Sequence, residues 1–147
     1  MNRARKFLAL PAFDRALLLR ALIALWLVRL LLWTVPYARV RAVVERLKKA
    51  SLPVDAGFRP SPERIAWSVR AASAGVATGA NCLLRALAGE ILLGRFGYQS
   101  ELKFGANRGG GAGLAAHAWL ECEGKMILGE LEAPGYAPFR RTLPERI

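Results

Sequence analysis

The fold depends most on residues 78–93, TGANCLLRALAGEILL. Thr78 and Asn81 are residue types that favour a helix start, because their side-chain oxygens accept hydrogen bonds from free N–H groups of the first turn. Large aliphatic residues then recur every three or four positions, which predicts one buried helical face: Leu83, Leu84, Leu87 and Ile91. The pattern therefore places Cys82 in the first turn of a helix.

Cys82 at this position has the surroundings of a nucleophile. The free N–H groups and the positive dipole end of a helix N-terminus favour thiolate over thiol. The chain has one histidine, His117, within LAAHAWLE (residues 114–121), a segment that we predict to be a strand. Taken singly, Cys82 is better explained as a small buried hydrophobe and His117 as a satisfied strand residue. Taken together, they indicate a nucleophile and its general base.

By composition the protein is small, hydrophobic and basic. At 147 residues the chain is one domain, or one small domain with an appendage, and 54% of its residues are hydrophobic. Two cysteines without a convincing secretory signal indicate free thiols and a cytoplasmic location. The first fifty residues hold eleven Lys and Arg against two acidic residues, which gives +9 of the total of +11. Such a region suits an acidic partner or an anionic membrane surface, whereas no nucleic-acid motif is present.

Residues 15–35 form a nearly continuous apolar run that predicts a long helix. Arg29 divides this run into pieces shorter than the ~20 residues that a bilayer span needs, and a central arginine costs roughly 2.5–3.5 kcal/mol on insertion. We therefore expect a buried or interfacial helix rather than a span. Docking on a protein partner and docking on a membrane surface both remain open. We assign residues 1–55 to this basic helical region and residues 56–147 to a catalytic core.

The remaining elements follow from their start and stop residues. A short helix is predicted over residues 40–47, and a second begins after Ser61, with Pro62 at its first position. Gly97 should end the helix of Cys82. A strand over residues 98–104 then leads into a glycine-rich run over 105–113. This run is either a mobile hairpin connection or a rim of the substrate cleft, to which we assign Asn107, Arg108 and Trp119.

The dipeptide Glu123-Gly124 between two apolar runs predicts a hairpin with a two-residue turn. With that turn, Cys122 pairs with Lys125, and an unbroken register places Glu130 opposite His117. A carboxylate there would accept the imidazole N–H, so Glu130 is the predicted third catalytic residue, with Glu132 as the competing acid. Strand alternation places Cys122 on the other face, where it belongs to the core.

The segments NCLLRALA (residues 81–88), HAWLE (117–121) and EGK (123–125) resemble the leader peptidase of lasso-peptide biosynthesis, a transglutaminase-like cysteine protease. The similarity covers residues 61–135 and points to the standalone protease half of a split maturation protein. It implies an α+β fold with a papain-like or transglutaminase-like core, and cleavage of the leader from a ribosomal precursor peptide. The implied partners are that precursor, a small leader-binding protein and an ATP-dependent cyclase.

The resemblance implies Cys82 as nucleophile and His117 as base, with no metal and no cofactor. It fails at the third position, because the family acid is usually Asp and no Asp follows Asp55. Asn81 and Thr78 are candidates for a side-chain donor to the oxyanion, beside the backbone N–H of Cys82. Two other readings stay open. One is a transglutaminase or peptide ligase with the same nucleophile, and the other is a noncatalytic scaffold or membrane-surface module.

Overall fold

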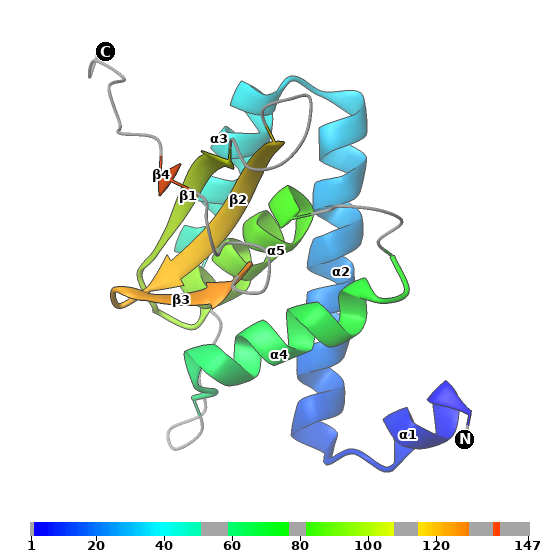
Figure 1. The fold of residues 1–147 in the computed structure, drawn as a ribbon. Helices are drawn as coiled ribbons and strands as arrows, with labels where there is room; N and C mark the ends of the chain where they lie inside the picture. The colour runs from blue at the N-terminus through cyan, green and yellow to red at the C-terminus, as the bar shows by residue number, and fades with distance from the viewer. Residues whose placement is uncertain (1, 51–58, 77–81, 108–114, 130–136, 139–147) are drawn as a thin grey trace.

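The computed structural model describes residues 2–50, 59–76, 82–107, 115–129 and 137–138 (Figure 1). Within these residues five helices are followed by four strands, and the fold is α+β. The elements are α1 (Arg3–Leu8), α2 (Ala12–Thr34), α3 (Tyr37–Lys49), α4 (Pro62–Ser73), α5 (Cys82–Arg95), β1 (Ser100–Asn107), β2 (Ala115–Cys122), β3 (Lys125–Leu128) and β4 (Ala137–Pro138). The strands form one antiparallel sheet in the order β3-β2-β1-β4.

Helix α5 lies at the centre of the fold, with the sheet on one side and α2 on the other (Figure 1). The apolar residues of α5 are buried on more than one face of the helix, because α3 and α4 also pack against it. One hydrophobic cluster joins all of these layers and includes Leu25 of α2, Val44 of α3, Val69 of α4, Leu87 of α5 and Leu120 of β2. A boundary near residue 55 therefore does not separate two hydrophobic cores.

The predicted helix boundaries of α4 and α5 are confirmed. Ser61 caps α4, and its Oγ accepts a hydrogen bond from the backbone N–H of Arg64 at 3.2 Å, with Pro62 as the first helical residue. Gly97 ends α5 with a φ of 83°, and the N–H of Tyr98 reaches the carbonyl of Leu93 at 2.9 Å. This is the hydrogen-bond pattern of a helix that stops at a left-handed glycine.

The long apolar helix α2 has a buried face and an exposed face. Leu17, Ala21, Leu25 and Val28 lie in the core, and Asp14 in the first turn pairs with Arg64 of α4. By length and composition α2 is a helix that could cross a membrane. In the folded chain α2 packs against α4 and α5, and 28% of its apolar window is buried.

Candidate active site

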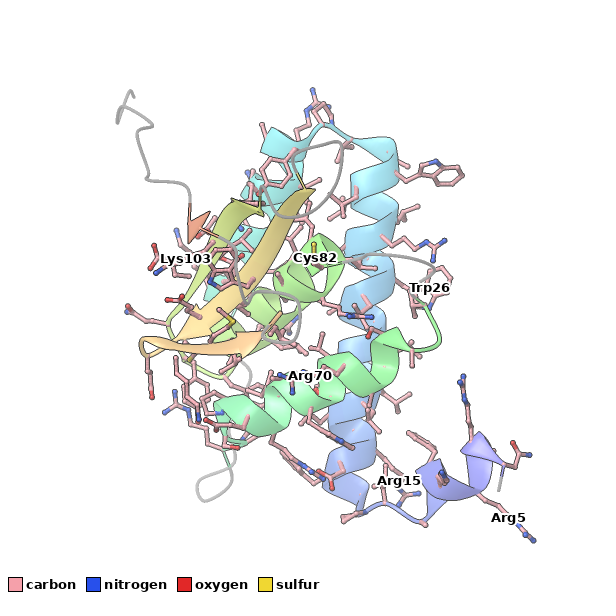
Figure 2. All side chains as sticks on the ribbon, in the orientation of Figure 1. Arg5, Arg15, Trp26, Arg70, Cys82 and Lys103 are labelled. Atoms are coloured by element: carbon pink, nitrogen blue, oxygen red, sulfur yellow. The ribbon has the colours of Figure 1, made fainter. Side chains whose placement is uncertain are left out.

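Cys82 is the first residue of α5 and is half-buried (Figure 2). The backbone N–H groups of the first turn of an α-helix have no partner within the helix, so they are free to bind a negative charge. Cys82 is thus the first described residue of this helix, at the end where the sequence predicts the helix to start. Thr78 and Asn81, the candidate oxyanion donors, lie outside the described residues.

Two contacts fix the end of α4 and the turn over residues 74–76, which immediately precedes residues 77–81. The guanidinium of Arg29 on α2 donates to the carbonyl of Val76, and Arg85 of α5 donates to Ser73 Oγ at 3.0 Å. Arg29 thus joins the long N-terminal helix to the approach to Cys82. Sequence reasoning treated Arg29 only as a charge that interrupts an apolar run. An arginine within an otherwise apolar helix could have indicated that its guanidinium has a specific buried acceptor.

A buried carboxylate joins α5 to α3. Glu90 is 1% exposed and accepts hydrogen bonds from Arg41 at 2.6 and 3.3 Å and from Lys48 at 2.8 Å. Glu45, on the same helix as these cations, contacts Arg41 at 2.9 Å and Lys48 at 3.4 Å. Two carboxylates therefore share two cations, which fixes α5 against its neighbour. The sequence did not identify Glu90, because nothing in a single helical repeat shows that its partners lie on α3.

Strand β2 carries His117, whose backbone pairs with Gly105 of β1. In Figure 1, α5 and β2 run in the same direction, so the Cys82 end of the helix and the Ala115 end of the strand lie at the same end of the fold. The two elements are packed together. The structure therefore brings the segments that carry Cys82 and His117 to one end of the helix and sheet layers.

Gly89 sits where α5 crosses the sheet. A Cβ at this position would lie 2.5 Å from Leu128 Cδ1 and 3.0 Å from Leu120 Cδ2, closer than van der Waals contact allows. Both leucines are fully buried. The missing side chain lets α5 approach β2 and β3 closely, and α5 and β2 are the elements that carry Cys82 and His117.

Trp119, which we expected on the cleft rim, is 4% exposed and lies inside the protein. Its Nε1–H donates to Glu121 Oε1 at 3.1 Å, and Lys103 of β1 contacts the other carboxylate oxygen at 2.8 Å. The hydrogen bond from Lys103, assisted by that from Trp119, lowers the pKa of the Glu121 carboxyl against an opposing effect of burial. Asn107 is the last residue of β1, and Arg108 lies outside the described residues.

The hairpin turn is confirmed at Glu123 and Gly124, whose φ values are 54° and 78°. Cys122 pairs with Lys125 as expected, and Glu121 pairs with Met126. The unbroken register is wrong beyond that pair, because a bulge between Leu120 and Glu121 places Leu120 opposite Leu128.

The pairing that placed Glu130 opposite His117 therefore does not continue along the strand. The described part of β3 ends at Leu128. Glu130 and the competing acid Glu132 both lie outside the described residues. The assignment of Glu130 as the third catalytic residue stays a prediction.

The second cysteine lies apart from α5's N-terminus. Cys122 is buried in the core, as predicted, and burial raises the pKa of its thiol. A thiol in such surroundings is a poor nucleophile. Among the described residues no cluster of three or more His, Cys, Asp or Glu side chains is arranged to hold a metal ion.

The comparison with known families matches the Transglutaminase-like superfamily over residues 19–143. This match includes α3 and α5, the sheet and most of α2, so it extends well beyond the segments around Cys82 and His117. No curated protein and no solved structure matched the chain. The helix that begins at Cys82, the strand that carries His117 and the extent of the match lead to one conclusion: the chain belongs to the transglutaminase-like superfamily.

Proposed function

We propose that the protein is a cysteine peptidase that removes the leader from a ribosomally made lasso-peptide precursor. One observation carries the proposal: Cys82 begins a helix packed along the strand of His117, in a superfamily that includes cysteine proteases. The segments around Cys82 and His117 also resemble the lasso leader peptidase. The resemblance supplies the substrate class, and the family membership supports the chemistry.

In the proposed reaction, His117 takes the proton of Cys82, and the thiolate sulfur attacks the carbonyl carbon of the peptide bond between leader and core. The negative charge on the carbonyl oxygen is bound by the backbone N–H of Cys82 and by a second donor, for which Asn81 and Thr78 are the candidates. His117 then gives its proton to the departing amine. Water hydrolyses the remaining thioester and regenerates the thiol. Glu130 is the proposed acid that orients the imidazole.

Three proteins are proposed as partners in this function: the precursor, a small leader-binding protein and an ATP-dependent cyclase that closes the ring after cleavage. Delivery by a leader-binding protein raises the effective concentration of the peptide bond at Cys82 without new chemistry. We therefore expect slow cleavage of the precursor alone and fast cleavage when the leader-binding protein is added.

The experiment combines the protein with a candidate precursor and leader-binding protein, and the products are identified by mass spectrometry. We expect two fragments that separate leader from core, and none with Cys82→Ala or His117→Ala. Both variants should keep the wild-type circular dichroism spectrum. An added amine distinguishes a ligase, because a product with the mass of an amide instead of an acid would replace the peptidase assignment. Cleavage that persists in Cys82→Ala would refute the proposed nucleophile.

A further inference from the structure

We propose that the exposed face of α2, together with α1, docks the protein on the surface of an anionic lipid bilayer. Five of the eight large hydrophobic residues exposed in the described part of the chain lie on α2, and they are 50–85% exposed. These residues are Leu19, Ile23, Trp26, Leu30 and Trp33. They recur every three or four positions, so they form one stripe along the helix, here called the α2 stripe.

The α2 stripe is directed away from the protein core. In Figure 2 the labelled Trp26 projects from α2 on the side opposite the sheet. Leu17, Leu25 and Val28 on the other face are fully buried. A helix with one face in the protein and an apolar face outside is suited to lie in the plane of a membrane surface. Tryptophans such as Trp26 and Trp33 favour the level of the lipid headgroups.

Basic residues accompany the α2 stripe at its edges and at its N-terminal end. Arg20 is exposed on α2, and Arg3, Arg5 and Lys6 are exposed on α1. Both acidic residues in the described part of residues 2–50 already form ion pairs. Asp14 pairs with Arg64, and the second acid pairs with two cations of its own helix, α3. This surface therefore presents apolar groups bordered by unneutralised positive charge, which complements anionic lipid headgroups.

The same charge argues against a second copy of the chain as the occupant. Whether two copies packed their α2 stripes in parallel or antiparallel, no acidic side chain of α1 or α2 would be left to pair with Arg20 and the α1 cations, because Asp14 already pairs with Arg64. A bilayer that contains anionic lipid buries the apolar residues and neutralises the cations together. The lipid surface is thus the occupant that fits both properties.

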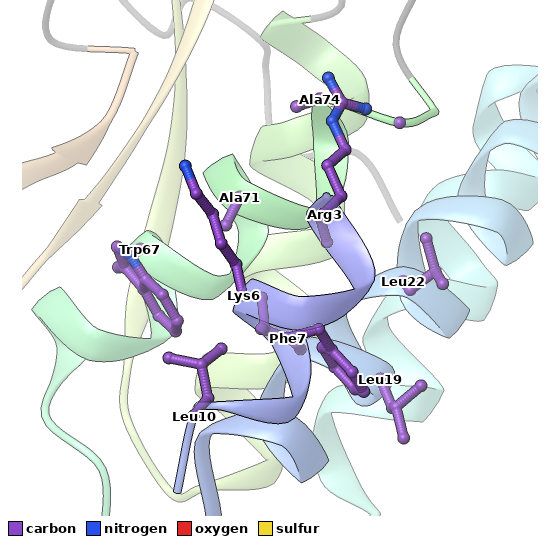
Figure 3. A pocket seen from close by; sticks show the side chains of 12 residues that line it. Arg3, Lys6, Phe7, Leu10, Leu19, Leu22, Trp67, Ala71 and Ala74 are labelled. Carbon is purple, nitrogen blue, oxygen red and sulfur yellow. The ribbon is translucent and has the colours of Figure 1, made fainter. Parts of the chain in front are cut away.

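A cavity of about 600 Å³ between α1, α2 and α4 continues this surface (Figure 3). Apolar side chains line it, among them Phe7, Leu19 and Trp67, while Arg3 and Lys6 also contribute to its wall. Leu19 belongs both to the cavity and to the α2 stripe. The apolar interior of the cavity suits the acyl chain of a lipid, and the two cations in its wall suit the anionic headgroup. We therefore assign this cavity to a lipid molecule of the bilayer.

The test measures co-sedimentation of the full chain with two kinds of vesicle, one of phosphatidylcholine alone and one in which phosphatidylglycerol replaces part of it. We expect binding to the anionic vesicles to exceed binding to the neutral ones by about tenfold or more, and to weaken as salt is added. The double variant Ile23→Ser with Trp33→Ser should lose most of this binding. Both residues are exposed, so the variant should keep its thermal unfolding midpoint.

A matched pair of charge variants separates a local site from general attraction. Arg3→Gln with Lys6→Gln removes two charges at the cavity, and Arg46→Gln with Lys49→Gln removes two exposed charges from α3. The first pair should weaken binding about tenfold or more, and the second should change it little. Equal loss from both pairs would overturn the proposal, because the attraction would then be unspecific.

Three further outcomes would also overturn the proposal. They are equal binding to neutral and anionic vesicles, retained binding in the Ile23→Ser with Trp33→Ser variant, and retention on vesicles after alkaline carbonate extraction, which would show a spanning helix. A dimer in solution that this variant dissociates, with no vesicle binding by the wild type, would assign the α2 stripe to a second copy of the chain.

Discussion

Replacing Glu90 by glutamine tests whether the contact between α3 and α5 depends on a buried charge. The carboxylate is 1% exposed and is held by Arg41 and Lys48 at 2.6–3.3 Å. Removing one side of a buried ion pair costs roughly 3–5 kcal/mol, because the remaining charges lose their partner. Arg41 and Lys48 keep Glu45 and are partly exposed, so Glu90→Gln should lie near the lower limit, at about 3 kcal/mol.

The loss is measured as the change in free energy of unfolding in urea and as the change in thermal midpoint. For a domain of this size, each kcal/mol lowers Tm by about 2–4 °C, so the expected decrease is roughly 6–12 °C. Because α5 begins at Cys82, the variant should also cleave peptide more slowly at temperatures just below its own midpoint. The wild type should retain full activity at those temperatures.

Glu45→Gln is the matched control, since Glu45 contacts the same two cations at 2.9 and 3.4 Å but has a side chain that is 46% exposed. Solvent weakens such a contact, and the expected loss is less than about 1 kcal/mol. Equal losses in the two variants, or a loss below about 1 kcal/mol in Glu90→Gln, would refute the argument from burial.

Three other predictions concern the site and its supports. Cys82→Ala should abolish cleavage, whereas Cys122→Ala should retain it and lose about 1 kcal/mol of stability; mass spectrometry and thermal unfolding would show the reverse if the assignment were wrong. Glu121→Gln should cost about 0.5–1 kcal/mol at neutral pH. Because folding lowers the pKa of this carboxyl, the deficit should vanish as pH falls below the unfolded value of about 4.3 and through the folded pKa, and a deficit that grows in acid would contradict it. Arg29→Met should reduce both cleavage and unfolding free energy, the latter by about 1–3 kcal/mol, because the buried carbonyl of Val76 loses its donor. Arg39→Met, at another exposed arginine, should change neither; equal effects in assays of both variants would count against the anchoring role of Arg29.

Elements with local start and stop signals could be predicted from the sequence. The Ser61-Pro62 start and the Gly97 stop act within one helical turn, so their residues alone suffice. The Glu123-Gly124 turn is equally local, because both φ values are properties of the two turn residues. The position of Cys82 follows from the helix that begins there.

Features that depend on packing between distant elements could not be predicted. The bulge at Leu120 has no glycine to mark it, and it brings Leu120 and Leu128 together beneath α5. The partners of Glu90 and the acceptor of Arg29 lie more than forty residues away in sequence. The burial of Trp119 has the same origin, since alternation along β2 does not show which face is covered.

The absence of a side chain at Gly89 affects the stability of the fold and the geometry of the proposed site to different extents. Alanine there would gain about 1 kcal/mol of helix propensity and lose about 1–3 kcal/mol through its collision with Leu120 and Leu128. The two effects partly cancel and leave a net loss of unfolding free energy of about 0–2 kcal/mol, and because both leucines are fully buried, we expect the collision to move α5 relative to β2. Gly89→Ala should therefore lower kcat strongly while it lowers Tm only slightly. A large fall in Tm that accompanies the fall in kcat would contradict this. The single hydrogen atom that replaces a side chain at residue 89 then determines the spacing between the two elements that carry the proposed nucleophile and base, so selection for the proposed catalysis can act at a residue that touches neither substrate nor nucleophile.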